Sequence, residues 1–220
     1  LISGVAFAIK SLRPECKVYG VQSEGAPSMY NSLRKEHICN LKHVKTIADG
    51  IAVKTPGDHT FEICSKYVDE IVTVSDDEVA SAILALMEQQ KLVAEGAGAV
   101  SVAAAMFNKV DIKGKKVCCV VSGGNIDVTI LSRVISRGLL NTGRSLSIKL
   151  ALTDKPGQLE AVSRIVAGLG GNIVSIYHDR YDLNIDIVSC ILDLRIETRD
   201  HEHIRSIVEK LKAEGFKIVD

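Results

Sequence analysis

The sequence predicts an α/β protein in which a parallel sheet, covered by helices on both faces, is followed by a second, smaller domain. Strand and helix patterns alternate through the first 140 residues, which is typical of a parallel sheet with helical connections. From about residue 145 the pattern changes to the order βαββαβ. Glycine and asparagine residues between 138 and 144 end a helix and predict a short linker between the two parts.

Each element of the first part is predicted by the spacing of its apolar residues, which recur every three or four positions in helices and form short runs in strands. Ser75 and Glu78 form a capping box, which predicts the start of a long helix. The predicted helices are 3–13, 28–36, 60–67, 79–90, 100–107 and 128–135, and the predicted strands are 16–22, 70–74 and 115–121. The strand at 115–121 is expected to be buried.

The same criteria apply to the second part. Its predicted strands are 147–152, 173–177, 185–194 and 217–219, and its predicted helices are 159–169 and 201–214.

The composition excludes nucleic-acid binding as a function. The chain has 220 residues, 46% hydrophobic and 25% charged, which is enough for a sizeable core. Its 27 basic residues balance 27 acidic ones, and aromatic residues make up 4% with no Trp. Broad electrostatic attraction to nucleic acid and stacking on bases are therefore not expected.

The sequence also predicts a cytoplasmic protein with no membrane partner. No stretch approaches the roughly 20 apolar residues that span a bilayer, and the start lacks a basic region followed by an apolar signal core. The six cysteines lack Cys-x-x-Cys spacing, so we expect reduced, mostly structural thiols at positions 16, 39, 64, 118, 119 and 190.

A Ser-Gly-Gly-Asn run at residues 122–125 is the most informative motif. It follows the predicted strand 115–121, so Ser122 is expected at the carboxyl end of a strand, where open α/β sheets bind ligands. A small hydroxyl there suits a planar cofactor, although the run alone also fits a phosphate loop or a plain tight turn. A Rossmann dinucleotide fold is the rival architecture, but no Gly-x-Gly-x-x-Gly follows a strand.

Two further segments complete a family resemblance, namely Glu-Gly-Ala-Gly-Ala at residues 95–99 and Ala-Asp-Gly at residues 48–50. With the Ser-Gly-Gly-Asn run, they resemble the carboxyl-terminal part of the threonine dehydratases (threonine ammonia-lyases) of the fold-type II pyridoxal phosphate family. Serine dehydratase and serine racemase belong to the same family. The resemblance covers the whole chain and implies pyridoxal 5'-phosphate as the cofactor.

The resemblance also implies roles for individual residues. Ser122 corresponds to the residue that faces the pyridine nitrogen, Glu95 lies near the ring, and Gly50 borders the cofactor. Gly123, which adjoins Ser122, and Leu1, which directly follows the position of the family's phosphate loop, are the other implied cofactor neighbours.

A serine beside the pyridine nitrogen has a chemical consequence. Its neutral hydroxyl leaves that nitrogen largely unprotonated, whereas a carboxylate would hold a proton there. The weaker electron sink suits β-elimination, and the implied reaction is deamination of L-threonine to 2-oxobutanoate and ammonia. Serine dehydratase or serine racemase activity, or a non-catalytic amino-acid-binding regulatory subunit, stays open as an alternative.

Two parts of the family pattern are absent from this sequence. The family uses a Schiff-base lysine on an early strand and a glycine-rich phosphate loop before the segment that matches residues 1–6. The chain begins with Leu instead and is interpreted as a fragment that is inactive by itself. Its lysines lie on polar faces or at element ends, so no catalytic residue is assigned.

No metal site is predicted. Some family members have an acidic metal site after the first strand of this region, but Gln22 and Ser28 stand here where acidic ligands are expected. His37, His43 and His59 lie apart in loop-like sequence, and we expect them at the surface.

The smaller domain resembles an ACT domain, a small-molecule regulatory module of amino-acid enzymes. The resemblance rests on the βαββαβ order, on Asp-Lys-Pro-Gly-Gln-Leu in the first turn and on Gly-Gly-Asn-Ile before the second strand, and it spans about residues 145–220. It implies an amino-acid effector, bound between the first turn and the start of the second strand, often across a dimer interface. The candidate effector-binding residues are Asp154, Gly157, Gln158, Leu159 and Asn172.

Two resemblances together define the expected organisation. Residues 1–140 form the carboxyl-terminal part of a pyridoxal-phosphate-dependent catalytic domain, 141–146 a linker, and 147–220 a ferredoxin-like ACT regulatory domain. The expected partners are an amino-acid substrate, an amino-acid effector and further copies of the chain in a dimer or tetramer. The attached domain favours threonine and isoleucine-linked control. The alternative for this domain is an ordinary ferredoxin-like fold in which Gly157 only starts a helix.

Overall fold

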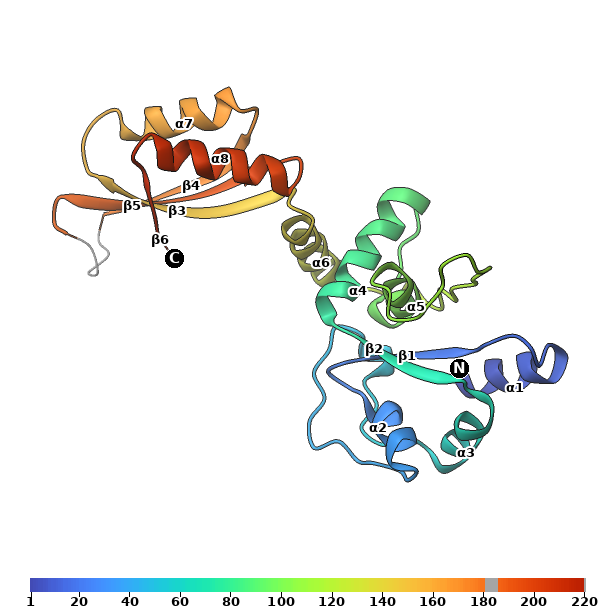
Figure 1. The fold of residues 1–220 in the computed structure, drawn as a ribbon. Helices are drawn as coiled ribbons and strands as arrows, with labels where there is room; N and C mark the ends of the chain where they lie inside the picture. The colour runs from blue at the N-terminus through green and yellow to red at the C-terminus, as the bar shows by residue number, and fades with distance from the viewer. Residues whose placement is uncertain (181–185, 220) are drawn as a thin grey trace. The chain divides into compact units, whose positions relative to one another are not determined.

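The computed structural model describes residues 1–180 and 186–219, and the chain divides into two compact units, Leu1–Gly138 and Leu139–Asp220 (Figure 1). Apolar periodicity and turn residues place the elements of the first unit close to where the sequence predicts them. They are α1 (Ile2–Leu12), β1 (Tyr19–Ser23), α2 (Ser28–Lys35), the 3-10 helix η1 (Asp49–Ile51), α3 (Asp58–Tyr67), β2 (Glu70–Val74), α4 (Asp76–Ala85), the π-helix η2 (Leu86–Gln90), α5 (Gly96–Met106) and α6 (Val128–Asn141), whose last residues belong to the second unit. Among the described residues, no helix has both the length and the apolar character to cross a membrane.

The first unit is built on the parallel pair β1 and β2, in register from Tyr19 opposite Glu70 to Ser23 opposite Val74. Helices α1, α2 and α3 cover one face of this pair, and α4 and α5 cover the other (Figure 1). Ile71 points into the first layer, whereas Val72 and Val74 belong to the cluster on the other side. The prediction of a parallel sheet with helices on both faces is confirmed.

The capping box at the start of α4 is confirmed. The backbone N–H of Glu78 donates to Ser75 Oγ at 3.2 Å, and the backbone N–H of Ser75 donates to Glu78 Oε2 at 2.8 Å. The Glu78 carboxylate also pairs with Lys109 Nζ at 2.8 Å. The helix predicted as continuous to residue 90 changes at Leu86 into a π-helix, which ends at Lys91 with a φ of 58°.

The strand predicted at residues 115–121 is wrong. Residues 116–127 have no regular secondary structure, and Val117 and Val120 are 50% and 47% exposed rather than buried. A strand is stabilised by hydrogen bonds to a neighbouring strand, and the described sheet of this unit consists of β1 and β2 alone. The segment instead lies along α5, where Ser101 Oγ donates to the carbonyl of Val120 at 2.8 Å.

The second unit is an antiparallel sheet with two helices packed on one face (Figure 1). Its core is formed where alternate apolar residues of β3 and β5 meet α7 and α8, including Leu150, Leu192 and Leu194, all fully buried. The sheet order β4-β5-β3-β6 and the predicted chain order βαββαβ agree with a ferredoxin-like arrangement. The elements are β3 (Ser145–Thr153), α7 (Gln158–Gly168), β4 (Asn172–Asp179), β5 (Ser189–Glu197), α8 (His201–Ala213) and β6 (Lys217–Val219).

Two boundaries of the second unit differ from the sequence prediction. The strand predicted from Ile185 begins at Ser189, and Ile185 itself lies outside the described residues, as does Asp220. Helix α6 continues to Asn141 and β3 already begins at Ser145. The turn between them requires Gly143, which has a φ of 71° and whose added Cβ would lie 2.5 Å from the backbone nitrogen of His201.

Asp69 ties together the layer of α1 and the entry to β1. Its carboxylate accepts hydrogen bonds from the Val18 backbone N–H at 2.7 Å and from Lys10 Nζ at 3.0 Å. Burial raises the pKa of Asp69, but the hydrogen bonds from Lys10 and Val18 outweigh it and hold the pKa below the ordinary value of 3.8. The ionised carboxylate is therefore stabilised by folding.

We predict that Asp69→Asn lowers the free energy of unfolding by about 1 kcal/mol at neutral pH, because the Asp69 side chain is partly exposed and its charge is partly screened. A depressed pKa stabilises the fold above the ordinary pKa, and this stabilisation is lost as the pH falls through the pKa of folded Asp69. The difference between the wild type and the variant should therefore shrink in acid.

Urea denaturation followed by circular dichroism, at neutral and at acid pH, measures both effects. Asp111→Asn is the matched control, because Asp111 pairs with Lys115 at the exposed surface. Equal destabilisation by the two substitutions at neutral pH would contradict this role for Asp69.

Candidate functional site

The Ser-Gly-Gly-Asn segment docks on the N-terminus of α5 through Glu95. Glu95 is the N-cap of α5, and its backbone N–H donates to the carbonyl of Gly123 at 3.0 Å. Its side chain returns to the same segment, where Oε2 accepts from the backbone N–H of Asn125 at 3.2 Å. Two hydrogen bonds thus hold residues 123–125 against the helix.

Glycines allow this close approach. A Cβ at Gly123 would lie 2.6 Å from Glu95 Oε1, and a Cβ at Gly98 would lie 2.6 Å from the carbonyl oxygen of Gly123. Gly50, in the 3-10 helix η1, lies on the same side, because its Cβ would lie 3.4 Å from Glu95 Oε1 and 3.1 Å from Ala97 Cβ. The structure therefore brings together three of the predicted cofactor neighbours, Gly50, Glu95 and Gly123.

The other two predicted residues are placed differently. Ser122 directly precedes Gly123 in this segment and is exposed. Leu1 is the N-cap of α1 and is 79% exposed, and no hydrogen bond among the described residues joins it to Glu95, Gly50 or Gly123. Ser122 is therefore positioned by the hydrogen-bonded Gly123 beside it, whereas Leu1 does not belong to the group of Gly50, Glu95 and Gly123.

These residues fit a flat ring such as that of pyridoxal phosphate. Any side chain at position 50 or 123 would fill the space beside the Glu95 carboxylate. Because both residues are glycines, the surface there is unobstructed. Ser122 supplies a neutral hydroxyl at the edge of that surface. The donor set contains one carboxylate and one hydroxyl, which suits an uncharged ring nitrogen better than a metal ion.

A cavity of about 750 Å³ in this unit lies elsewhere. It runs along the edge of β2 that does not pair with β1, and it is also lined by residues of α2 and α3 such as Arg34 and Cys64. This cavity follows an open sheet edge and does not include Gly50, Glu95 or Gly123. We therefore interpret it as a consequence of the unpaired edge rather than as a ligand site.

The second unit has a pocket of about 320 Å³ between the end of β3, the N-terminus of α7 and the end of β4. Gly157, the N-cap of α7, has a φ of 90°, a left-handed conformation that favours glycine. Four of the five predicted effector residues line the pocket. The lining residues are Leu152, Thr153, Asp154, Lys155, Pro156, Gly157, Gln158, Leu159, His178, Arg180, Cys190 and Leu192.

Asn172, the fifth predicted effector residue, does not line this pocket. It is the first residue of β4, where its side-chain amide donates to Glu197 Oε2 at 2.8 Å. The pocket is at the opposite end of β4, beside His178, and an extended strand rises about 3.3 Å per residue, so the two positions are roughly 20 Å apart.

Among the pocket residues that were not predicted from the sequence are His178, Arg180 and Cys190, which lie outside the first turn. Arg180 Nε contacts both carboxylate oxygens of Asp154, at 3.2 and 3.0 Å. Burial raises the pKa of the Cys190 thiol, and the nearby Asp154 carboxylate raises it further while Arg180 opposes this. Cys190 is therefore a protonated thiol at the floor of the pocket at neutral pH.

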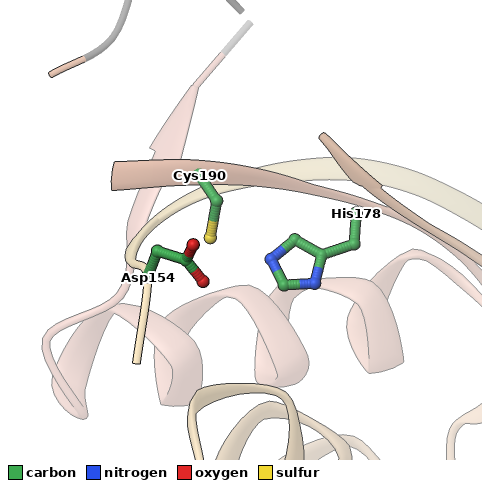
Figure 2. A group of neighbouring side chains, drawn as sticks. All are labelled: Asp154, His178 and Cys190. Atoms are coloured by element: carbon green, nitrogen blue, oxygen red, sulfur yellow. The ribbon is translucent and has the colours of Figure 1, made fainter. Parts of the chain in front are cut away.

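The side chains of Asp154, His178 and Cys190 point toward one another (Figure 2). One potential ligand atom from each residue lies within 4.8 Å of the others. Sequence spacing carries no signal for this group, since His178 is in β4, Cys190 is in β5 and Asp154 directly follows β3. Strand register brings two of the three together, because Cys190 on β5 lies opposite Leu152 on β3, and His178 on β4 lies opposite Leu192 on β5.

Comparison with known proteins places this site in a family. Residues 1–123 match the family described as pyridoxal-phosphate dependent enzymes. Over 218 residues the chain is 50% identical to L-threonine ammonia-lyase of Thermotoga maritima, which covers 99% of this chain and 54% of that protein. It is 34% identical to a biosynthetic L-threonine dehydratase of Halalkalibacterium halodurans, covering 99% of this chain and 52% of that protein. The chain thus spans about half the length of the curated relatives it matches.

Solved structures give the same picture. A threonine deaminase isoform of Solanum lycopersicum aligns with 64% of this chain and 39% of its own, at 35% identity and a TM-score of 0.59. Maize serine racemase aligns with 64% of this chain and 44% of its own, at 31% identity and a TM-score of 0.56. These matches confirm the resemblance that the residues around Ser122 and Glu95 indicate.

We predict that Gly123→Ala lowers the free energy of unfolding by about 1–3 kcal/mol, because its Cβ overlaps the Glu95 carboxylate and the segment must move. The same substitution should speed amide hydrogen exchange at Asn125, whose N–H bonds to Glu95.

Gly4→Ala is the matched control, since nothing lies within 4 Å of a Cβ added there in α1. It should be neutral or stabilising by up to about 1 kcal/mol. Urea denaturation measures the stability of both variants, and hydrogen-exchange mass spectrometry measures exchange near Asn125. If Gly123→Ala and Gly4→Ala gave the same stability and the same exchange, the docking of this segment would be contradicted.

Proposed function

Because this chain belongs to the pyridoxal-phosphate dependent enzyme family, we propose that it is part of an L-threonine ammonia-lyase that converts L-threonine to 2-oxobutanoate and ammonia. The observation that supports this most directly is the group formed by Glu95, Gly50 and Gly123 at the N-terminus of α5. Its members are those that the family resemblance assigns to the cofactor, although they are up to 73 positions apart in the sequence. The names of the relatives, from threonine ammonia-lyase to biosynthetic threonine dehydratase, favour threonine as the substrate.

Each residue of this group has a distinct task in the proposal. Pyridoxal phosphate, when bound, supplies an electron sink that weakens the Cα–H bond of the amino acid. Gly50 and Gly123 leave room for the ring, and the Glu95 carboxylate holds the turn by accepting the Asn125 N–H. Ser122 would face the ring nitrogen with a neutral hydroxyl that does not protonate it, which would suit elimination of the β-hydroxyl.

Three lysines of this chain are held in ion pairs, which supports the view that these three do not react with substrate. Lys10, Lys109 and Lys115 are paired with Asp69, Glu78 and Asp111 at 2.7–2.8 Å. A catalytic lysine needs a free amine and thus a lowered pKa, whereas the hydrogen bond to Asp111 raises the pKa of Lys115.

We further propose that the second unit is a regulatory module for a free amino acid. An amino acid carries an ammonium and a carboxylate, and the pocket offers a partner for each. The Asp154 carboxylate suits the ammonium, and the Arg180 guanidinium with the N-terminal backbone N–H groups of α7 suits the carboxylate. A volume of about 320 Å³ is at the small end of ligand pockets, as expected for a single amino acid.

The outer strand of this unit supports the proposal that two copies pair side by side. Strand β4 is at the edge of the sheet, and its side chains Val174, Ile176 and Tyr177 are exposed. An exposed apolar edge strand is a ready site for pairing with another chain. Light scattering on the 220-residue chain checks this, and a monomeric mass would contradict it.

We predict that this chain deaminates threonine when it is combined with the part of a relative that it lacks. The chain is produced together with the part of the Thermotoga maritima relative that it does not match, and release of 2-oxobutanoate from threonine is followed. Ser122→Asp should lower turnover by roughly tenfold or more, because its carboxylate would protonate the ring nitrogen. Ser136→Asp, an exposed position in α6, is the matched control and should have no effect.

Three outcomes would count against the proposal. A stable complex of the two parts without turnover would contradict threonine deamination, and faster turnover of serine than of threonine would favour serine dehydratase. Equal activity of Ser122→Asp and Ser136→Asp would contradict the proposed role of Ser122 beside the ring nitrogen, but it would leave the proposed reaction standing.

For the second unit, we predict that isothermal titration of the whole chain detects binding of isoleucine or valine, with threonine and serine as comparisons. Asp154→Asn should weaken binding by about tenfold or more, because the ammonium loses its charged partner. Asn172→Ala, roughly 20 Å from the pocket, should leave the heat unchanged. Absence of heat with all four amino acids would contradict an amino-acid sensor.

A further inference from the structure

The cluster of Asp154, His178 and Cys190 in the second unit is unexplained by an amino-acid pocket alone. A buried thiol and an imidazole contribute little to binding an ammonium or a carboxylate, yet both face Asp154 (Figure 2). We propose that these three side chains bind a divalent transition-metal ion of the zinc class. The site lies in a different unit from the residues assigned to the cofactor, so it does not rest on the catalytic proposal.

The backbone geometry supports a built site. Cys190 is 1% exposed and is held in the middle of the sheet between β3 and β4. His178 lies on the neighbouring strand β4, in register opposite Leu192, and Asp154 directly follows β3 on the other side, where its backbone N–H donates to the carbonyl of Val188 at 2.8 Å. The sheet thus holds one ligand firmly at the floor and presents the other two at the pocket wall.

The distances are within reach of a tetrahedral ion. Zinc bonds to sulfur, nitrogen and oxygen ligands at about 2.0–2.3 Å, so neighbouring ligand atoms around one ion are roughly 3.5 Å apart. The potential ligand atoms here lie within 4.8 Å of one another. His178 and Asp154 are exposed, so rotation of their side chains can close this difference without moving a strand.

The ligand types select the class of ion. Thiolate, imidazole and carboxylate are the ligands of zinc and cobalt, whereas calcium and magnesium need several carboxylate oxygens. Only one carboxylate belongs to this cluster, and Arg180 already places positive charge 3.0 Å from it. For calcium or magnesium, attraction to a single carboxylate is too weak to offset repulsion by the Arg180 guanidinium. A zinc–thiolate bond has covalent character and therefore does not depend on charge alone.

Binding at this site changes the proton balance in a defined way. The Cys190 thiol loses its proton as the metal–sulfur bond forms, so each bound ion releases one proton from the thiol to solvent. Three protein ligands leave a fourth position that faces the pocket, where water or a small ligand can bind. Asp154 serves both this site and the proposed effector pocket, so the two proposals must be tested with different variants.

The test uses Co²⁺ as a spectroscopic probe on the whole chain with its thiols kept reduced. We expect one tightly bound ion per chain, with a thiolate-to-cobalt charge-transfer band and the intense visible bands of tetrahedral cobalt. Added Zn²⁺ should remove this spectrum stoichiometrically, whereas excess Mg²⁺ should not. No tetrahedral cobalt spectrum in the wild-type chain would overturn the proposal.

The variants assign the site. Cys190→Ser should abolish the charge-transfer band, and His178→Gln should weaken binding by at least about tenfold. Because His178 is exposed, its substitution leaves the core intact even if the cysteine variant misfolds. The matched controls, Cys118→Ser and His59→Gln, change an exposed thiol and an exposed imidazole in the other unit and should have no effect.

Each outcome decides between defined alternatives. Loss of the band in Cys118→Ser, or its persistence in Cys190→Ser, would assign cobalt to another thiol and overturn the proposal. Because the metal is titrated without amino acid, and isoleucine is titrated in the presence of a chelator, failure of either binding event leaves the other result interpretable.

Discussion

Backbone-to-backbone contact at the N-terminus of α5 is the constraint on which the site of the first unit depends. Gly96 and Gly98 have no side chains at the points where the chain near Ile47 and the carbonyl of Gly123 approach the helix, each within 2.6 Å of where a Cβ would stand. Three segments that are distant in sequence can therefore meet at one helix end. Glu95 then uses its carboxylate to fix the third segment, which carries Ser122.

Local patterns predict elements whose stabilising interactions are also local. The capping box of α4 is confirmed as predicted, because it depends on residues three positions apart, and the strand at residues 70–74 is confirmed because it finds a partner strand in β1. The same reasoning fails for residues 115–121, which have the apolar composition of a strand but no partner strand among the described residues. Composition indicates what a segment can form, and hydrogen-bonding neighbours decide whether it does.

The two sites differ in how much of each the sequence reveals. In the first unit, glycine-rich motifs indicate Gly50, Glu95 and Gly123, because close backbone packing restricts residue type at each position. In the second unit, the first turn indicates Asp154, but His178 and its partners are brought there only by the register of adjacent strands. No spacing rule in a single chain encodes that register. The pyridoxal phosphate family is established, while the ACT resemblance and the effector residues stay predictions.

The unpaired edge of β2 has a consequence for how this unit meets other polypeptide. Its backbone N–H and C=O groups are oriented for a strand, and they recognise an extended main chain rather than a particular side-chain sequence. Selectivity at such an edge must come from what surrounds it. Here Arg34, Asp69 and Glu70 border the groove, and charged side chains beside an open strand edge disfavour pairing with a purely apolar strand. These charges thus limit indiscriminate cross-β association at an edge that the described residues leave unpaired.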